Sequence, residues 1–337
     1  MESRIGSVLS WGVVGTGQVS SFVSSDLARV DGARLRAVAS RSDQRAGEFA
    51  DGHGFEVGYG SVKELLDDAT VNVVYIATPH ATHADIAVAA LEAGKHILVE
   101  KPMAVDGAEV AAITSAARAA GTFAMEAMWM RFNPTYRSML ADLAGGLIGD
   151  TRSVRAYVGL PFGQWDSAQW SAERRSSTLL DQMIYAFALA RDVLGDPDEM
   201  SGAVGTRLDG VDLIAEITLR QGDRFAHLAS SMVTFLEPTA SVSGTGGWLT
   251  LSPPFWGTNG YSRHRGDLAN ALFAPERHDR TASGYGYTPM LEQVQAAIRE
   301  GLVEHPWHTL ADTASLMRLI ELAHTALQWR PVGSTGS

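Results

Sequence analysis

Residues 9–20 read Leu9-Ser10-Trp11-Gly12-Val13-Val14-Gly15-Thr16-Gly17-Gln18-Val19-Ser20 and decide the fold of the first half of the chain. The apolar start predicts a buried strand, and a helix is expected to begin after the glycines. Gly15 permits a tight turn, and Gly17 has no Cβ to keep a pyrophosphate from the helix N-terminus. Ser20 is small enough for close packing of helix on strand. This order predicts a dinucleotide turn at the start of a βαβ unit, with a ligand-free glycine turn as the alternative. We assign five residues of the turn to cofactor binding: Gly15, Thr16, Gly17, Gln18 and Val19.

The next hundred residues repeat this alternation of strand and helix. Short β-branched runs predict strands at residues 9–14, 35–39, 71–76, 97–99 and 123–125. Amphipathic segments with capping signals predict helices at residues 19–29, 44–53 (with Asp43 as a cap), 62–67, 84–93 and 106–120. The pattern is typical of a doubly wound parallel sheet, so residues 1–128 are predicted to form an NADP-binding Rossmann domain.

The pattern changes after about Trp129. Helices are predicted at residues 134–143, 178–194, 290–300 and 309–328, and strands at residues 153–159, 211–219, 225–233, 240–243 and 248–251. Successive strands without helices between them indicate an α+β domain with a mostly antiparallel, open sheet. Residues 257–286 are polar and rich in glycine, which predicts a loop. Residues 129–330 are assigned to substrate binding and oligomerisation, and residues 331–337 to a flexible tail.

Composition narrows the classes of chemistry. The 337 residues contain no cysteine, which excludes disulfides, thiolate metal sites and cysteine nucleophiles. A formal net charge of −11 argues against nucleic acid and against anionic membrane surfaces as partners. The start of the chain shows no secretory signal pattern, and no apolar run is long enough to span a membrane. We therefore expect a cytoplasmic protein.

The end of the second predicted strand bears on the choice of cofactor. The sequence there is Ala39-Ser40-Arg41-Ser42, without the Asp or Glu that usually binds the ribose 2′-hydroxyl of NAD. Ser40 and Arg41 suit a 2′-phosphate instead, because a hydroxyl can donate to it and a guanidinium can pair with it. We predict NADP, with NAD possible; a solvated arginine in a polar loop is the alternative.

Two further strand ends are predicted to face the same crevice, because ligands of open α/β sheets collect at the carboxyl ends of the strands. The first loop contributes Thr78, Pro79, His80 and His83, for which helix entry and cofactor packing are expected and no metal site. The second is Glu100-Lys101-Pro102, where Lys101 is a candidate for chemistry or for an ion pair with Glu100.

Together these motifs resemble the Gfo/Idh/MocA family of nicotinamide-dependent oxidoreductases. The resemblance rests on Gly15-Thr16-Gly17, Ala39-Ser40-Arg41, Val74-Tyr75-Ile76-Ala77-Thr78-Pro79-His80 with His83, Ala93-Gly94-Lys95-His96 and Glu100-Lys101-Pro102. The segment from Met125 to Pro134 is similar to the branch that contains dimeric dihydrodiol dehydrogenase and NADP-dependent D-xylose 1-dehydrogenases. The resemblance implies a homodimer or homotetramer.

The resemblance also implies a second catalytic segment, Leu179-Leu180-Asp181-Gln182-Met183-Ile184-Tyr185. It implies Tyr185 as the acid–base group, Lys101 as the cation that lowers the pKa of that phenol, and Asp181 as a partner of substrate hydroxyls. Two departures stand out: Ser176-Ser177-Thr178 replaces a glycine tract, and Met183 replaces a glycine. Tyr185 as an ordinary core residue is the alternative.

The predicted substrate is a small polyhydroxylated molecule. Aromatic rings stack on sugar faces and arginine binds hydroxyls, so five residues are assigned to the substrate: Trp129, Arg131, Phe162, Trp165 and Asp181. His305, Trp307 and His308 are assigned only capping and packing. The expected activity is hydride transfer between NADP and a carbinol or carbonyl of an aldose or related polyol. The alternatives are a trans-dihydrodiol dehydrogenase and an NADP-binding sensor with weak turnover.

Overall fold

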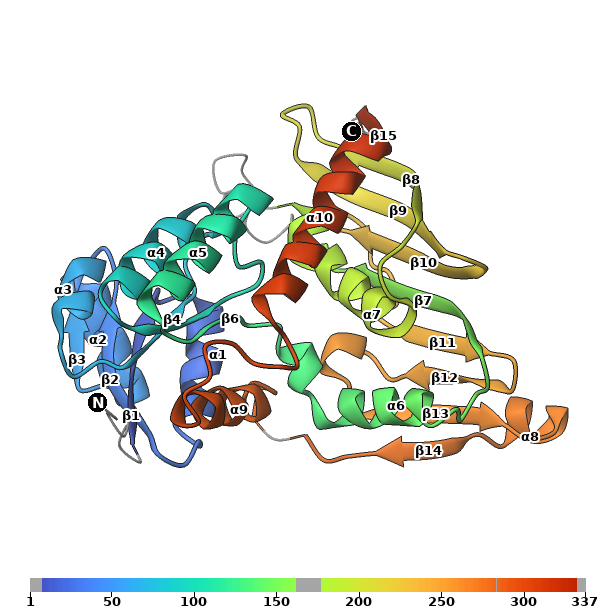
Figure 1. Cartoon of the computed structure of the whole chain (residues 1–337), viewed down its shortest axis with the longest axis horizontal. Coiled ribbons are helices and arrows are strands. Elements are labelled where there is room, and N and C mark those ends of the chain that lie inside the picture. Colours follow the sequence, from blue (N-terminus) through green and yellow to red (C-terminus); the bar gives the residue numbers. More distant parts are fainter. Residues whose placement is uncertain (1–7, 162–176, 283, 332–337) are drawn as a thin grey trace. The chain divides into compact units, whose positions relative to one another are not determined.

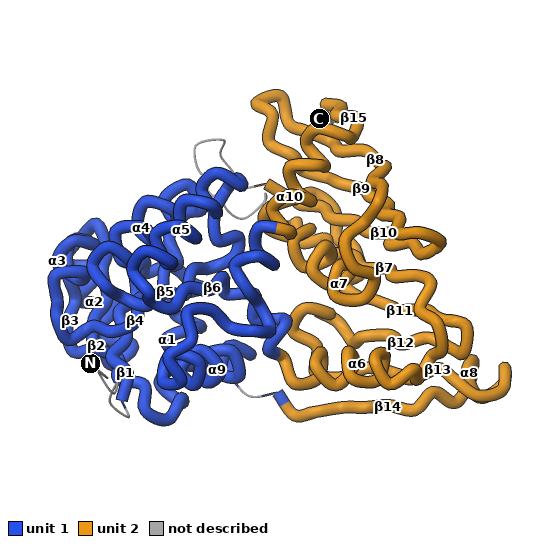
Figure 2. The backbone as a smooth tube through the Cα atoms, viewed as in Figure 1, with its two compact units in different colours: residues 1–132, 282–314 blue, residues 133–281, 315–337 orange. Residues whose placement is uncertain are grey.

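The computed structural model describes residues 8–161, 177–282 and 284–331. The chain divides into two compact units (Figure 2): unit 1 comprises Met1–Phe132 and Ala282–Ala314, and unit 2 comprises Asn133–Thr281 and Ser315–Ser337. Each unit is discontinuous in the sequence, because the chain returns to unit 1 after building most of unit 2. The functional roles predicted for the two halves of the chain stay predictions.

Unit 1 contains a six-stranded parallel sheet in the order β3-β2-β1-β4-β5-β6. Its strands are β1 (Leu9–Val14), β2 (Ala33–Ala39), β3 (Val57–Tyr59), β4 (Val73–Ile76), β5 (His96–Val99) and β6 (Ala124–Glu126). Val14 pairs with Ala39 on one side and with Ile76 on the other, so the carboxyl ends of these strands meet at one edge. The predicted Rossmann sheet is confirmed.

Helices cover both faces of this sheet (Figure 1). They are α1 (Gln18–Leu27), α2 (Asp43–His53), α3 (Val62–Asp67), α4 (His83–Glu92), α5 (Gly107–Ala120) and α9 (Thr288–Arg299). One core joins α1 and α9 to the sheet through fully buried side chains that include Trp11, Val23, Tyr75 and Met290. Helices α4 and α5 lie side by side on the other face. The C-terminal part of the chain thus supplies a layer of the N-terminal fold.

Unit 2 is built on a nine-stranded mixed sheet in the order β14-β13-β12-β11-β7-β10-β9-β8-β15. The strands are β7 (Thr151–Gly159), β8 (Glu199–Thr206), β9 (Asp212–Gln221), β10 (Arg224–Ser231), β11 (Ala240–Gly244), β12 (Gly247–Leu251), β13 (Gly260–Arg265), β14 (Glu276–Asp279) and β15 (Gln328–Pro331). Among the described strands of this nine-stranded sheet, only the pairs β7–β10 and β8–β15 are parallel. The prediction of a mostly antiparallel open sheet is confirmed.

Helix α7 (Ile184–Leu194) packs against β7 and β10. It follows a π-helical turn, Leu179–Met183, and its residues from Ile184 to Ala190 are all buried. The other helices that contribute to this unit are α6 (Pro134–Ala144), α8 (Leu268–Phe273) and α10 (Leu310–Ala326), whose first turn belongs to unit 1. Within the described ranges, no helix is both long and apolar enough to cross a membrane.

The structure corrects several predicted elements. The predicted loop at residues 257–286 contains β13, α8 and β14, because its strands carry arginine and histidine, which hide the alternation. Strands β3 and β8 were not predicted; both are partly exposed and contain glycine. Strand β15 was not predicted either: α10 ends at Ala326, before the predicted end at residue 328, and β15 extends to Pro331, the first residue of the predicted tail. The cap of α2 is Ser42, which accepts the N–H of Arg45, and Asp43 is the first residue of the helix. The predicted helix 178–194 begins with the π-helical turn.

Candidate active site

The turn between β1 and α1 contains two glycines, Gly15 and Gly17, and the structure gives a different reason for a glycine at each position. Gly15 has φ of 109°, and a Cβ there would overlap the carbonyl oxygen of Ala77 at the end of β4. Gly17 has open space around its Cα: a Cβ on this residue would meet no described atom within 4 Å. Ser20 is fully buried below the turn. The fold itself therefore requires Gly15, whereas the space at Gly17 is left for something outside the chain.

The N-terminus of α1 also lacks a side-chain cap. Gly17 occupies the N-cap position and has no side chain to accept the N–H groups of the first turn, and the first turn has no acidic residue. By contrast, Ser42, Ser61 and Asp106 accept backbone N–H groups at the starts of α2, α3 and α5. Uncapped N–H groups at the positive end of a helix dipole favour an anion. The turn therefore fits the pyrophosphate of a dinucleotide.

The tip of β2 presents a positive charge and no carboxylate. Arg41 is exposed, and none of the described residues forms a hydrogen bond or ion pair with its guanidinium. Ser40 donates its backbone N–H to Tyr59. The hydroxyl oxygen of Ser42 caps α2, which leaves its hydrogen available for another acceptor. This chemistry suits a phosphate at the ribose better than a bare hydroxyl.

His83 connects the loop after β4 with the loop after β5. Its ring is fully buried at the start of α4; Nδ1 lies 3.0 Å from the Pro102 carbonyl oxygen, and Nε2 lies 2.8 Å from that of Thr78. Burial lowers the pKa of His83 to about 4. A neutral imidazole has one N–H and can donate to only one of the two carbonyls at a time. His83 therefore donates one hydrogen bond, either to the loop after β4 or to the loop after β5, and its ring lies between the two loops.

Lys101 lies in a turn beside the buried carboxylate of Glu100 and near the ring of His80. The Glu100 carboxylate accepts the Tyr75 hydroxyl at 2.5 Å and the backbone N–H of Lys101 at 3.1 Å. Burial raises the pKa of Glu100. Desolvation and, to a smaller extent, the nearby Lys101 ammonium together lower the pKa of His80 to about 3. The neutral His80 ring and the Lys101 ammonium thus lie close together at the carboxyl edge of the sheet.

The other catalytic candidates lie in unit 2, at the start of α7. The Asp181 carboxylate accepts the backbone N–H of Ser177 at 3.1 Å. Tyr185 is 7% exposed, and its ring stacks on Trp256 with centroids 5.5 Å apart and an interplanar angle of 15°. Met183 is fully buried. A π-helical turn is often found at functional sites, and here it contains Asp181 directly before the helix that carries Tyr185.

Two residues that support this segment were missed by the sequence analysis. Asp212, at the start of β9, accepts the backbone N–H of Leu179 at 2.8 Å, and burial raises its pKa. Trp256 packs on Tyr185 from a short 3₁₀ turn, Phe255–Gly257. Neither residue lies in a motif, and both contacts bridge distant parts of the sequence, so no local signal could have identified them.

The predicted substrate-binding residues Trp129 and Arg131 contact other side chains of the protein. Trp129 packs on Tyr287 with ring centroids 5.0 Å apart. Arg131 is buried; its guanidinium lies 2.7 Å from Nδ1 of His308 and 3.7 Å from Asp312. These partners belong to unit 1 itself, and the predicted contact of Arg131 with substrate stays a prediction. Phe162 and Trp165 lie outside the described residues.

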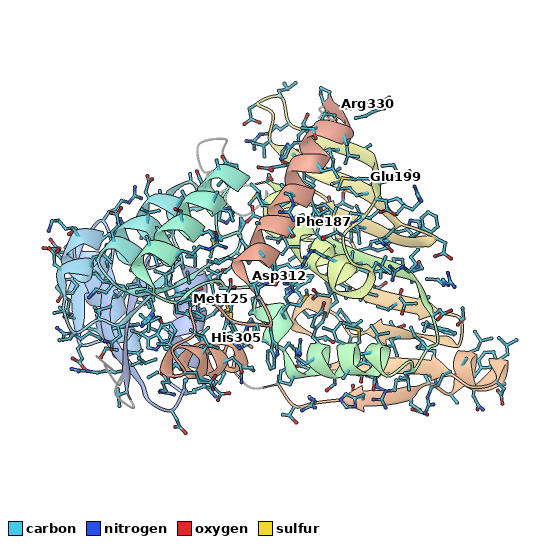
Figure 3. The ribbon with its side chains drawn as sticks, in the orientation of Figure 1. Met125, Phe187, Glu199, His305, Asp312 and Arg330 are labelled. Atoms are coloured by element: carbon cyan, nitrogen blue, oxygen red, sulfur yellow. The ribbon has the colours of Figure 1, made fainter. Side chains whose placement is uncertain are left out.

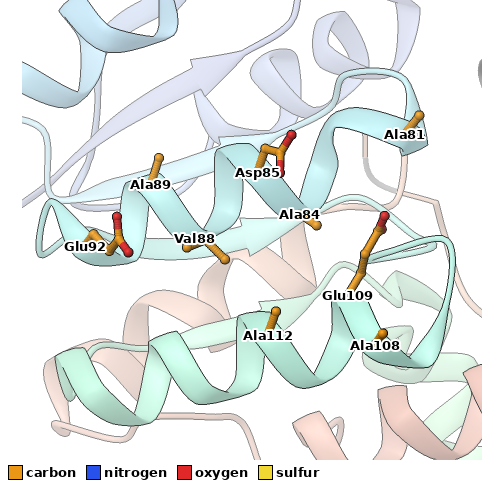
Figure 4. Close-up of a pocket in the computed structure, with 9 residues that line it drawn as sticks. All are labelled: Ala81, Ala84, Asp85, Val88, Ala89, Glu92, Ala108, Glu109 and Ala112. Atoms are coloured by element: carbon orange, nitrogen blue, oxygen red, sulfur yellow. The ribbon is translucent and has the colours of Figure 1, made fainter.

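A surface groove between α4 and α5 is a feature of helix packing (Figure 4). Its lining is mostly alanine, with Asp85, Glu92 and Glu109 at its margins. None of the predicted site residues lines it. The groove follows from the small side chains that let the two helices approach, and it is not assigned to the active site.

Comparison with known proteins identifies the family. Residues 9–127 match the model of the Gfo/Idh/MocA oxidoreductase family with its NAD-binding Rossmann fold, and residues 136–250 match the model of the Gfo/Idh/MocA C-terminal domain. The chain belongs to the Gfo/Idh/MocA family. As a member it is an oxidoreductase.

Curated relatives of this chain are named dehydrogenases. The trans-1,2-dihydrobenzene-1,2-diol dehydrogenase of Sus scrofa is 34% identical over 327 residues, which cover 95% of this chain and 97% of the relative. The human enzyme of that name is 33% identical over 326 residues, which cover the same shares of both chains.

Solved structures of other oxidoreductases share the Gfo/Idh/MocA fold of this chain. Levoglucosan dehydrogenase in complex with NADH and levoglucosan has a TM-score of 0.86 at 21% identity, covering 94% of this chain and 96% of that one. A 3-ketoreductase from Actinomadura kijaniata with NADP and TDP-benzene has a TM-score of 0.84 at 23% identity, covering 97% and 100%. At this identity the likeness concerns the fold.

Proposed function

We propose that this oxidoreductase uses NADP and transfers a hydride between the nicotinamide and a carbinol or carbonyl carbon of an aldose or related polyol. The observation that carries the cofactor assignment is the combination of an uncapped glycine turn at α1 with an exposed arginine and no carboxylate at the tip of β2. Gly15, Thr16, Gly17, Gln18 and Val19 would hold the pyrophosphate, and Ser40 and Arg41 the 2′-phosphate. NAD remains the second candidate cofactor.

The chemistry is assigned to three side chains. The bound nicotinamide supplies the hydride acceptor or donor. In the oxidative direction, the Tyr185 phenolate accepts the hydroxyl proton of the substrate while its carbinol carbon loses a hydride. The Lys101 ammonium favours the phenolate and holds the reacting oxygen, and Asp181 binds a neighbouring hydroxyl. Support comes from the buried frame around Lys101, the buried position of Tyr185 and the match to the family.

A trans-dihydrodiol is the second candidate substrate. The observation in its favour is the identity of 33–34% over 95% of the chain with enzymes named for trans-1,2-dihydrobenzene-1,2-diol. Both substrate classes carry vicinal hydroxyls, which suits one group that exchanges a proton and a second group that orients the neighbouring hydroxyl. The side chains that differ between this chain and its relatives decide which class binds better.

The test is the formation of reduced nicotinamide with NADP or NAD against a panel of aldoses, inositols and trans-dihydrodiols. We expect turnover with NADP at a kcat/KM at least tenfold above that with NAD. Turnover on dihydrodiols but not on sugars would select the second substrate class. Tight NADP binding without turnover on any member of the panel would contradict the enzyme assignment and indicate an NADP-binding sensor.

We also propose that the chain forms a homodimer or homotetramer through the sheet of unit 2. Ala226 and Leu228 of β10 are buried, whereas the alternate residues Phe225 and His227 are exposed. Alternation along a strand places the exposed pair on the opposite face of the sheet. Light scattering should give a dimeric or larger mass for the wild type, which Phe225→Arg should reduce. Leu208→Arg, at a position 93% exposed, is the control. A monomeric wild type would contradict this assignment.

A further inference from the structure

Three buried side chains hold the backbone of the Lys101 turn, residues 100–103, at three successive residues. The contacts are Lys101 N–H to Glu100 Oε2 at 3.1 Å, Pro102 carbonyl oxygen to His83 Nδ1 at 3.0 Å, and Met103 N–H to Glu126 Oε1 at 2.9 Å. We call these three side chains the anchors of the turn. The first, Glu100, lies in the turn itself, and the second, His83, lies at the start of α4. The third comes from the end of β6, on the neighbouring strand.

Glu126 is a buried carboxylate that accepts several hydrogen bonds. It is 1% exposed. Its second oxygen, Oε2, accepts Nε2–H of His308 at 2.8 Å and the Thr313 hydroxyl at 3.1 Å. Burial by itself would raise the pKa of Glu126, but the hydrogen bonds from His308, Met103 and Thr313 hold it below its ordinary value. The carboxylate is therefore ionised at neutral pH, and its two oxygens serve different segments.

The orientation of His308 follows from its other neighbour. An N–H of Arg131 lies 2.7 Å from Nδ1 of His308. A guanidinium can only donate, so Nδ1 must accept, and the proton of the neutral ring sits on Nε2, facing Glu126. Met125 on β6 and Asp312 in the first turn of α10, labelled in Figure 3, mark the two segments that this chain of hydrogen bonds joins. The predicted role of His308 as a capping and packing residue is too narrow.

We propose that Glu126, oriented by His308 and Thr313, is a positioning residue that fixes the backbone of the Lys101 turn and thereby the location of the Lys101 ammonium. This inference rests on the proposed function, in which Lys101 assists the proton transfer. Its physical basis is that burying a carboxylate carries a large desolvation penalty, which an apolar side chain of similar volume in the same core would not have. A carboxylate that divides its two oxygens between the turn and the returning C-terminal segment can fix their relative position, which an apolar side chain cannot do.

The two partners of Glu126 allow a graded set of variants. Glu126→Gln keeps the shape, but its amide N–H₂ must face either the Met103 N–H or the His308 N–H, so it loses either the hydrogen bond to the turn or the one that orients the side chain. Thr313→Val removes one hydrogen bond to Glu126 at nearly constant volume, and Thr313→Ser restores the hydroxyl. Glu109→Gln is the matched control, because Glu109 also accepts a backbone N–H, that of Val105 at 3.1 Å, outside the Lys101 turn.

The first measurement is independent of activity. Hydrogen–deuterium exchange at the Met103 amide, resolved with overlapping peptides that end before Val105, should accelerate in Glu126→Gln and, to a smaller extent, in Thr313→Val. Thr313→Ser and Glu109→Gln should leave exchange at Met103 unchanged. Unchanged exchange in both Glu126→Gln and Thr313→Val would overturn the anchor. This result stands whether or not the proposed function is correct.

The second measurement is kinetic. A displaced turn should lower kcat of Glu126→Gln by about 10- to 100-fold with the KM for NADP within about threefold of the wild type. It should also move the acidic limb of the pH profile of kcat/KM for oxidation to higher pH, because the ammonium no longer favours the phenolate. Thr313→Val should show the same changes in smaller measure, with rescue by Thr313→Ser.

The outcomes separate the two proposals. Accelerated exchange together with a lower kcat and a shifted acidic limb supports the positioning role. Accelerated exchange with an unshifted acidic limb would overturn it and make Glu126 a purely structural residue. If Glu126→Gln does not fold, the pair Thr313→Val and Thr313→Ser decides by the same criteria. A wild type without turnover on the whole panel contradicts the proposed function, and with it the positioning role, whereas the exchange data still decide the anchor.

Discussion

Gly15 is held so close to Ala77 that a Cβ on the glycine would overlap the carbonyl oxygen at the end of β4. Its φ of 109° adds a second reason against any side chain there. Gly15→Ala should therefore lower the free energy of unfolding by about 1–3 kcal/mol. Gly17→Ala meets open space at a φ of −84°, so its free energy of unfolding should stay within about 1 kcal/mol of the wild type.

Comparing Gly15→Ala with Gly17→Ala distinguishes an effect on folding stability from an effect on cofactor binding. Although Gly17→Ala should be stable, its methyl group would occupy the approach to the α1 N-terminus, and NADP should bind at least tenfold more weakly. Urea unfolding measures the stability, and the fluorescence of bound NADPH measures the dissociation constant. Undiminished NADP affinity in Gly17→Ala would show that the pyrophosphate does not lie at this turn.

Arg41 should decide the choice between the two nicotinamide cofactors. Because a charge-assisted bond to a phosphate contributes about 1.5–3 kcal/mol, Arg41→Ala should raise the KM for NADP by about 10- to 100-fold and leave that for NAD nearly unchanged. Arg45→Ala, an exposed arginine in the first turn of α2, is the control for net charge. If the KM for NADP of Arg41→Ala equals that of the wild type, the assignment of the 2′-phosphate site is wrong.

Much of unit 1 could be predicted because its signals are local. Strands β1 and β4 are runs buried on both faces, and Ser61 and Asp106 cap α3 and α5 close to the predicted starts of these helices. The glycine turn and the position of Lys101 after β5 are local signals as well. Strand β3 escaped prediction because its three residues are only half-buried and include Gly58.

The parts that could not be predicted depend on contacts between distant residues. Strands β13 and β14 carry arginine and histidine near the edge of the nine-stranded sheet, so no apolar alternation reveals them. Glu126 and His308 are 182 residues apart and lie in no shared motif. The frame around Lys101 is therefore visible only after the chain has folded back into unit 1.

The return of the chain into unit 1 is secured by Asp26. This fully buried carboxylate on α1 accepts the backbone N–H groups of Tyr285, Tyr287 and Thr288 at the start of α9. Asp26→Asn replaces one accepting oxygen by a donor that faces other donors, which should lower the free energy of unfolding by about 1–3 kcal/mol. Asp51→Asn, exposed on α2, is the control. Equal urea midpoints for the two variants would show that the Asp26 contacts contribute little to stability.

The variants Tyr185→Phe and Lys101→Met together test the assignment of Tyr185 and Lys101 to proton transfer. Tyr185→Phe removes the acid–base hydroxyl and Lys101→Met removes the ammonium, so each should lower kcat by about 10²- to 10⁴-fold. Dissociation constants for NADP should change much less in Tyr185→Phe than in Lys101→Met, because only Lys101 belongs to the Rossmann unit. Lys63→Met and Tyr157→Phe serve as controls away from the predicted site. Near-normal turnover of both Lys101→Met and Tyr185→Phe would exclude the proposed mechanism.

The buried ring of His83 should make stability depend on pH. Its pKa is about 4 in the folded protein and about 6.5 in an unfolded chain, so between these values the unfolded state binds the extra proton. The contribution of His83 to stability is therefore complete above pH 6.5 and is lost as the pH falls toward 4, by up to about 1.4 kcal/mol per pH unit. His80, with a pKa of about 3, acts in the same direction.

The free energy of unfolding in urea at pH 7 and at pH 5 measures this effect. His83→Gln should be less stable than the wild type at pH 7, because the hydrogen bond from the buried ring to one of the two loops is lost, yet it should lose less of its stability between pH 7 and pH 5. A drop in His83→Gln as large as in the wild type would show that His83 titrates in the folded protein as it does in the unfolded chain. In that case the imidazole would not be held neutral between the loops after β4 and β5.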